Sequence, residues 1–111
     1  MEVTIAGRHV QVTEPMSRHI QEHVDRLPRF DGHIQYITVA LGVESGFRTV
    51  EVIAKCHKAD LVAEAKSHDM YQSIDEAFAK MQRQIVRHHD KMVHNAARAA
   101  QRASETDKRP G

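Results

Sequence analysis

The feature that most constrains the fold is the stretch of residues 69–104, which contains neither glycine nor proline. These two residues destabilise a helix interior most strongly, so a stretch of this length without either favours one continuous helix. At about 100° per residue, its large apolar side chains fall within an arc of roughly 60°. They are Ile74, Phe78, Met81, Ile85 and Met92. A stripe this narrow predicts that one side of the helix packs on the rest of the protein.

A second stripe on the same helix is basic. Residues 80–104 contain six Lys or Arg residues and a single acidic residue, a net charge of +5, whereas residues 1–79 contain eight basic and twelve acidic residues, a net charge of −4. The six basic residues are Lys80, Arg83, Arg87, Lys91, Arg98 and Arg102. They fall within about 100° of one another, on a face centred roughly 140° from the apolar stripe, and extend over about 33 Å of helix.

An excess of one charge on a helix face indicates a charged partner. Exposed helices usually alternate acidic and basic residues four positions apart, because like charges at that spacing repel one another. A polyanion would relieve this repulsion, so we favour a nucleic acid, with an acidic protein or a membrane surface as alternatives. Structured RNA is preferred to duplex DNA, because no helix-turn-helix, zinc-finger or zipper pattern accompanies the basic stripe.

The first residues predict a strand and then a helix. Val3 and Ile5 alternate with polar residues up to Gly7, which indicates a strand that can resume through Val10 and Val12.

A helix is expected next, over residues 14–27. Thr13 can cap its N-terminus, and Pro15 is tolerated in a first turn. Its apolar face contains Met16, Ile20, Val24 and Leu27. Pro28 then ends the helix.

Three further strands follow. Every second residue is apolar over residues 37–43 and again over residues 50–56, and Ser45-Gly46 between them predicts a hairpin turn. A second reversal at residues 57–60 leads to a third run over residues 61–65. The element order is βαβββα. It predicts an α+β two-layer sandwich in which two helices pack on one face of a four-stranded, mainly antiparallel sheet.

Composition indicates the class of protein, its compartment and its domain organisation. The chain is 41% hydrophobic but lacks the 18 to 20 consecutive apolar residues of a membrane span, and we expect no secretion signal. The single cysteine, Cys56, shares its strand face with apolar residues, so we expect it to be buried in a cytoplasmic protein. We expect one domain over residues 1–94, followed by a basic helical extension and loose tail over residues 95–111.

Nine histidines raise the question of a metal site. His19 and His23 have the spacing that places two rings on one helix face, but no third ligand is evident from the sequence. We therefore expect surface histidines, no metal and no cofactor. His88 lies near the basic stripe and can donate to phosphate. No set of nucleophile, base and orienting acid is apparent, so we expect no enzyme activity.

The segment from Asp69 to Asp75, followed by the basic residues from Lys80 to Lys91, resembles the last helix of the ribosome hibernation promoting factor family, also described as sigma-54 modulation proteins. Ile5-Ala6-Gly7-Arg8 is similar to the opening strand of that family, and Arg26-Leu27 with Arg29-Phe30 to the end of its first helix. The resemblance covers about residues 1–94 and implies the same βαβββα fold.

The resemblance also implies a function. A hibernation factor binds the small ribosomal subunit near the decoding centre, blocks mRNA and tRNA sterically, and silences translation under stress and in stationary phase. The residues expected to contact rRNA are Lys80, Arg83, Arg87, His88 and Lys91, with Arg26 and Arg29 as weaker candidates and Arg98 and Arg102 as extrapolations. We expect no small-molecule substrate and a monomer away from the ribosome.

Two features leave alternatives open. The first helix is not lysine-rich as in many relatives, and the chain is too short for the C-terminal dimerisation domain of long family members. The sequence does not decide whether ribosome dimers are promoted or opposed. The alternative function is a protein-interaction module that modulates transcription.

Overall fold

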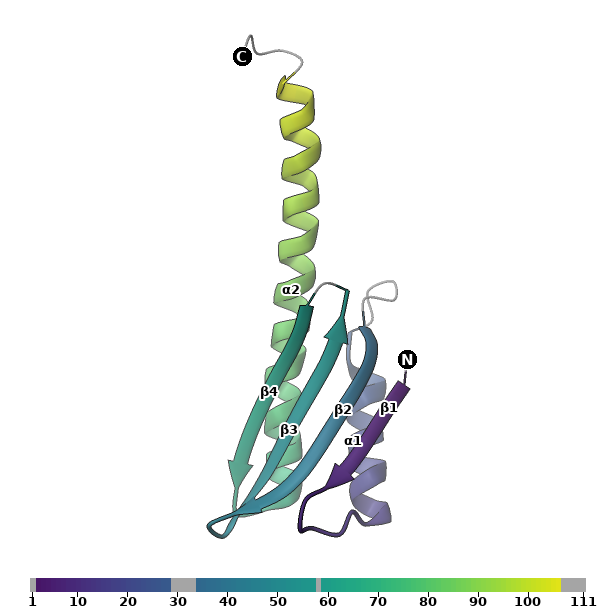
Figure 1. The fold of residues 1–111 in the computed structure, drawn as a ribbon, viewed down its shortest axis with the longest axis vertical. Helices are drawn as coiled ribbons and strands as arrows, with labels where there is room; N and C mark the ends of the chain where they lie inside the picture. Colours follow the sequence, from purple (N-terminus) through teal and green to yellow (C-terminus); the bar gives the residue numbers. More distant parts are fainter. Residues whose placement is uncertain (1, 29–33, 58, 107–111) are drawn as a thin grey trace.

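The computed structural model describes residues 2–28, 34–57 and 59–106, with side chains described as far as His94. The elements follow the predicted order βαβββα (Figure 1). They are β1 (Glu2–Gly7), α1 (Glu14–Arg26), β2 (Ile34–Glu44), β3 (Phe47–Cys56), β4 (Ala59–Ser67) and α2 (Met70–Thr106).

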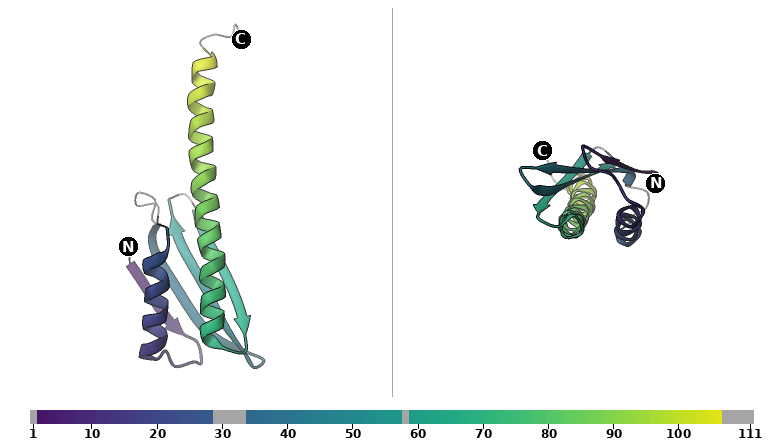
Figure 2. Two further views of the ribbon diagram at one scale, coloured as in Figure 1. Left: turned by 180° about the vertical axis from the view of Figure 1, so that it is seen from behind. Right: turned by 90° about the horizontal axis from the view of Figure 1, so that it is seen from below.

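The four strands form one sheet in the order β1-β2-β3-β4. β1 pairs with β2 in parallel, and the other two pairings are antiparallel. Both helices lie on the same face of the sheet, and α2 crosses β3 and β4 (Figure 2). The predicted α+β two-layer sandwich is therefore confirmed. The opposite face of the sheet, called here the open face, is covered by no helix among the described residues.

The predicted hairpin turn between β2 and β3 is confirmed. Glu44 pairs with Phe47, which leaves Ser45 and Gly46 as a two-residue loop. Both have positive φ, 50° at Ser45 and 84° at Gly46. Two successive positive φ values are typical of a type I′ turn, whose twist matches that of the flanking strands.

The first strand is shorter than its longest predicted extent. β1 ends at Gly7, and Val10 and Val12 lie in the connection to α1, where they pack against the core without being part of a strand. A Cβ at Gly7 would lie 2.2 Å from the backbone oxygen of Val10, so the chain folds back where only glycine leaves room. His9, with φ of 58°, completes the change of direction.

Both helix N-termini are capped by side chains. The hydroxyl of Thr13 accepts a hydrogen bond from Met16 N at 3.3 Å, as predicted. Asp69 caps α2, because its carboxylate accepts a hydrogen bond from Tyr71 N at 3.1 Å. The hydroxyl of Ser67 donates to the backbone oxygen of Asp69 at 2.7 Å and so supports the cap.

The core lies between the sheet and the two helices. It includes the predicted alternating residues of β2 from Ile37 to Leu41 and of β3 from Val50 to Cys56, and burial raises the pKa of the Cys56 thiol. Val43, the last residue of the predicted run in β2, is exposed and lies outside the core. From the helices it takes Ile20, Val24, Ile74, Phe78, Met81 and Ile85. Met92, the last residue of the predicted apolar stripe, is only half-buried. Among the described side chains, the buried part of α2 therefore ends at Ile85, about two turns before Met92.

α2 has 37 residues, a length of about 55 Å at 1.5 Å per residue. It continues well past the end of the sheet (Figure 1). In the part of the chain that the structure describes, no helix combines the length and apolar character needed to span a membrane.

Candidate nucleic-acid interface

The exposed basic face of α2 is formed by Arg83, Arg87 and Lys91. Their spacing of four residues places them on successive turns of the side of α2 that faces away from the core. Among the described residues, none of the three forms an ion pair with an acidic side chain. These three cations are therefore available to a partner.

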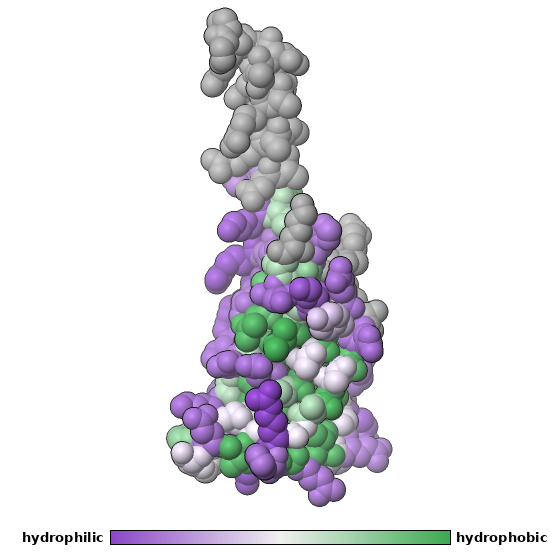
Figure 3. Space-filling view, in the orientation of Figure 1, coloured by the Kyte–Doolittle hydropathy of each residue, from purple (hydrophilic) through white to green (hydrophobic). Residues whose placement is uncertain are grey.

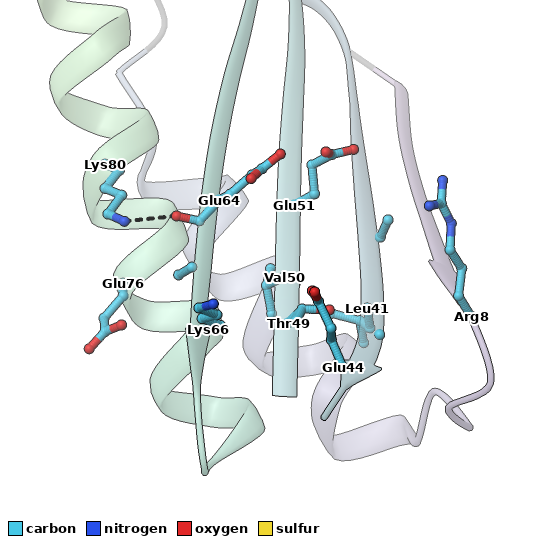
Figure 4. Close-up of a pocket in the computed structure, with 13 residues that line it drawn as sticks. Arg8, Leu41, Glu44, Thr49, Val50, Glu51, Glu64, Lys66, Glu76 and Lys80 are labelled. Carbon is cyan, nitrogen blue, oxygen red and sulfur yellow. Dashed lines mark hydrogen bonds between the residues drawn. The ribbon is translucent and has the colours of Figure 1, made fainter. Parts of the chain in front are cut away.

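Lys80 is exposed as well, but it has a partner within the protein. Its Nζ atom donates to the backbone oxygen of Glu64 in β4 at 2.8 Å (Figure 4). One turn later, the side-chain amide of Gln84 donates to the backbone oxygen of Val62 at 2.6 Å. The two bonds attach α2 to the edge strand of the sheet. Lys80 thus has a structural role that its place in the basic stripe did not indicate.

Arg26 lies at the end of α1 and faces the neighbouring helix. It lines a hollow of about 190 Å³ together with Phe78, Ala79 and Gln82 of α2. A second hollow of about 580 Å³ is lined by Ala79, Gln82, Arg83 and Arg87, among others. The two hollows share Ala79 and Gln82, so Arg26 lies beside the exposed basic face.

Other predicted contact residues are placed differently. His88 is half-buried, its Nε2 atom is fully buried, and no described residue gives that atom a hydrogen-bond partner. This placement disfavours a phosphate contact through Nε2. Arg29 lies outside the described residues. Arg98 and Arg102 belong to α2, but their side chains are outside the described part.

The open face of the sheet has a different character. It holds a depression of about 510 Å³ whose lining mixes acidic residues with Arg8, Lys66 and Lys80 (Figure 4). Exposed apolar side chains, Tyr36 and Val62, also lie on the sheet, and the surface seen from this side alternates between polar and apolar (Figure 3). A surface of mixed charge is a poorer match for a phosphate backbone than the basic face of α2.

Glu51 and Glu64 are directly opposite one another in β3 and β4 on the open face (Figure 4). A hydrogen bond with Glu64 raises the pKa of Glu51, and partial burial and the negative charge of Glu64 raise it further, while Arg8 lowers it. Sequence reasoning missed this pair. The available signal was that both residues occupy outward positions in strands that pair with each other.

Residues 3–93 match the family described as "Sigma 54 modulation protein / S30EA ribosomal protein". The chain belongs to this family. Membership of this ribosomal protein family agrees with the resemblance carried by the segment from Asp69 to Lys91.

The chain is also similar to curated relatives. The chain is 31% identical over 93 residues to a ribosome hibernation promoting factor of Azotobacter vinelandii, a match that covers 84% of this chain and 87% of the relative. It is 33% identical over 91 residues to the ribosome hibernation promoting factor of Pseudomonas putida, with 82% and 89% covered.

A solved structure has the same fold. A ribosomal subunit interface protein from Coxiella burnetii superposes with a TM-score of 0.77 at 19% identity, covering 81% of this chain and 99% of the other. The α+β arrangement is therefore shared with this solved structure, and the C-terminal part of α2 is the main portion of this chain beyond the family match.

Proposed function

We propose that this protein is a ribosome hibernation factor. It binds the small ribosomal subunit near the decoding centre and silences translation under stress by occupying space that mRNA and tRNA need. Family membership and the names of the curated relatives support this function over the alternative of a module that modulates transcription. The structural observation that carries the proposal is the exposed basic face of Arg83, Arg87 and Lys91.

The chemistry of the proposed contact is electrostatic. Three cations on successive turns of a rigid helix span about 12 Å, from Arg83 to Lys91, at 1.5 Å per residue. Phosphates follow one another along RNA at intervals comparable to the spacing between neighbouring cations on this face. The three side chains can therefore each neutralise a phosphate and release its counterions. Arg26 adds a fourth cation across the hollow between the helices. Contacts of this kind fix position without reading sequence, which suits a factor that blocks a site by its shape.

A binding titration tests the proposal. Purified small subunits are titrated with the protein at several salt concentrations, and the slope of log affinity against log salt is measured. The double variant Arg83→Glu, Arg87→Glu should bind at least tenfold more weakly and show a shallower slope, by about 0.7 to 0.9 for each phosphate that the variant no longer neutralises. The matched control is Arg48→Glu, Lys66→Glu, which changes the net charge equally at exposed positions on the sheet.

Three outcomes decide between the proposed functions. Weaker binding by the α2 variant alone, together with competition between the protein and mRNA or initiator tRNA on the subunit, would support steric block. Normal binding by the α2 variant would falsify the proposal. If nuclease treatment of a cell extract left a partner bound to the basic face, the transcription alternative would replace it.

A further inference from the structure

Two histidines of α1 and one aspartate of α2 converge on a single point. The Nε2 atoms of His19 and His23 each lie 2.6 Å from the same oxygen, Oδ1 of Asp75. The two histidines are four residues apart on one helix face, and Asp75 is more than 50 residues later in the sequence. This aspartate is the third ligand that was not evident from the sequence, because only the packing of α1 against α2 brings it near.

Neighbouring aromatic rings hold the two imidazoles in orientation. His23 stacks on Phe78, with ring centroids 5.0 Å apart and planes 11° from parallel. His19 makes edge contacts with Tyr71 at 5.2 Å and with His23 at 5.1 Å. These contacts come from side chains of α2 and α1 that are part of the packed helix pair. Both Nε2 atoms are therefore directed at Asp75 before any ligand arrives.

The cluster is also accessible. The side chains of His19, His23 and Asp75 are 30%, 22% and 54% exposed. The hollow between the helices, of about 190 Å³, is lined by His23 and Asp75 and provides space beside these two residues. An ion from solvent can thus reach all three groups, and a water molecule has room to complete its coordination.

Two imidazole nitrogens and a carboxylate oxygen form a familiar donor set for first-row divalent metals, above all zinc. The three ligand atoms lie within 4.8 Å of one another. Zinc ligands at about 2.0 to 2.1 Å from the metal stand roughly 3.3 Å apart in a tetrahedron, so small side-chain rotations suffice to admit the ion. Burial raises the pKa of Asp75, but hydrogen bonds with His23 and His19 outweigh it and lower the pKa overall.

We propose that His19, His23 and Asp75 form a three-ligand site for Zn²⁺ that joins α1 to α2, with water in the fourth position. The bound ion replaces two hydrogen bonds by three metal–ligand bonds. It fixes the two helices relative to each other, next to Arg26, which lines the same hollow. The site depends on the packing of the helices and not on the proposed ribosomal function.

Cobalt titration tests the site directly. Tag-free, full-length protein is stripped with a chelator and titrated with Co²⁺, which gives visible d–d absorption when its coordination is tetrahedral. We expect one Co²⁺ per chain, with the absorption disappearing when Zn²⁺ displaces it. His19→Gln, His23→Gln and Asp75→Asn should each weaken Zn²⁺ binding at least tenfold. Asp75→Asn keeps a hydrogen-bond acceptor for the histidines, so it separates metal binding from folding.

Exposed histidines elsewhere provide the control. His9→Gln and His57→Gln remove imidazoles at exposed positions outside the cluster and should leave the affinity unchanged. Zn²⁺ should also raise the melting temperature of the wild type and not that of Asp75→Asn. Absence of the tetrahedral absorption, or equal affinity in the wild type and the three cluster variants, would overturn the proposal and leave a hydrogen-bonded contact between the helices.

Discussion

Lys80 donates a hydrogen bond from its Nζ atom to the backbone oxygen of Glu64, 2.8 Å away on the edge strand of the sheet. Gln84 does the same to Val62, so α2 covers two alternate carbonyl groups of β4. Unpaired groups of an edge strand can pair with another chain, and side chains that occupy them reduce that hazard. This relationship separates Lys80 from the three cations of the exposed basic face.

The different roles of Lys80 and of the exposed basic face can be measured with two variants that each remove one positive charge. Lys80→Met should lower the free energy of unfolding by about 0.5–1.5 kcal/mol, the usual contribution of one hydrogen bond. Arg87→Met should leave stability within about 0.5 kcal/mol of wild type and weaken binding to the small subunit. Chemical denaturation and subunit titration give the two readings. Equal effects of both variants on binding would show that Lys80 belongs to the interface after all.

Ser73 should be needed for stability. It is a fully buried polar residue whose hydroxyl donates to the backbone oxygen of Arg48 at 2.7 Å and lies 2.7 Å from the hydroxyl of Ser67. Ser73→Ala leaves buried polar atoms without a partner and should cost about 1–3 kcal/mol of unfolding free energy. Gln72→Ala, at the adjacent exposed position, should cost less than about 0.5 kcal/mol. A Ser73→Ala protein as stable as the Gln72→Ala control would show that the hydrogen bonds of Ser73 do not contribute to stability.

The close approach at Gly7 gives another test. The Cβ added by Gly7→Ala would meet the backbone oxygen of Val10, which cannot rotate away as a side chain could. The connection between β1 and α1 must then shift, at a cost of about 1–3 kcal/mol. Thermal denaturation of Gly7→Ala beside Ala6→Ser, a change at an exposed neighbour, measures it. Melting temperatures that agree for the two variants would show that the connection adapts freely.

The Glu51–Glu64 pair predicts a pH dependence. The pKa of Glu51 is raised in the folded protein, so the stability linked to its proton is present below the ordinary glutamate pKa and is lost as the pH rises through the raised value. Glu51→Gln removes the carboxyl group and with it the negative charge that faces Glu64. It should be more stable than wild type at pH 7, by about 0.2–1 kcal/mol for relieving a cross-strand like-charge pair. This gain in the free energy of unfolding should vanish below about pH 4, where glutamate is protonated. A gain of equal size at pH 7 and below pH 4 would contradict a raised pKa of Glu51.

The domain boundary predicted near residue 94 can be tested by truncation. Among the side chains that the structure describes, Ile85 is the last buried apolar residue of α2, and Met92 is half-buried. A chain of residues 1–94 should therefore keep its free energy of unfolding within about 1 kcal/mol of the full chain. Its salt slope for subunit binding reports whether Arg98 and Arg102 contact phosphates. A large drop in stability would place residues 95–111 inside the folded domain.

Much of the fold could be predicted from local patterns. The alternation over residues 37–43 and 50–56 and the Ser45-Gly46 turn indicated the hairpin, and the apolar stripe indicated the buried side of α2. The predicted extension of β1 through Val10 and Val12 is wrong. The chain folds back at Gly7, where the backbone of Val10 approaches closely, and the alternation of apolar residues does not reveal this contact.

For the candidate site, spacing alone indicated that Arg83, Arg87 and Lys91 share an exposed face, because side-chain direction repeats with the helix turn. The same spacing assigned Lys80 to that face without revealing its bond to β4. It also placed His88 beside the stripe, whereas packing buries its Nε2 atom. For Lys80 the difference arises from the edge strand that lies beside the helix, which spacing along the helix does not report.

The sequence by itself determined which elements form and which side of each is apolar, since those properties depend on residues three or four positions apart in a helix and two apart in a strand. Only the tertiary structure decided that Lys80 reaches Glu64 and that Glu51 faces Glu64. It likewise decided that Asp75 meets His19 and His23. The physical reason is that such contacts depend on strand register and on how two helices pack across a shared sheet, and neither is encoded in the spacing of neighbouring residues.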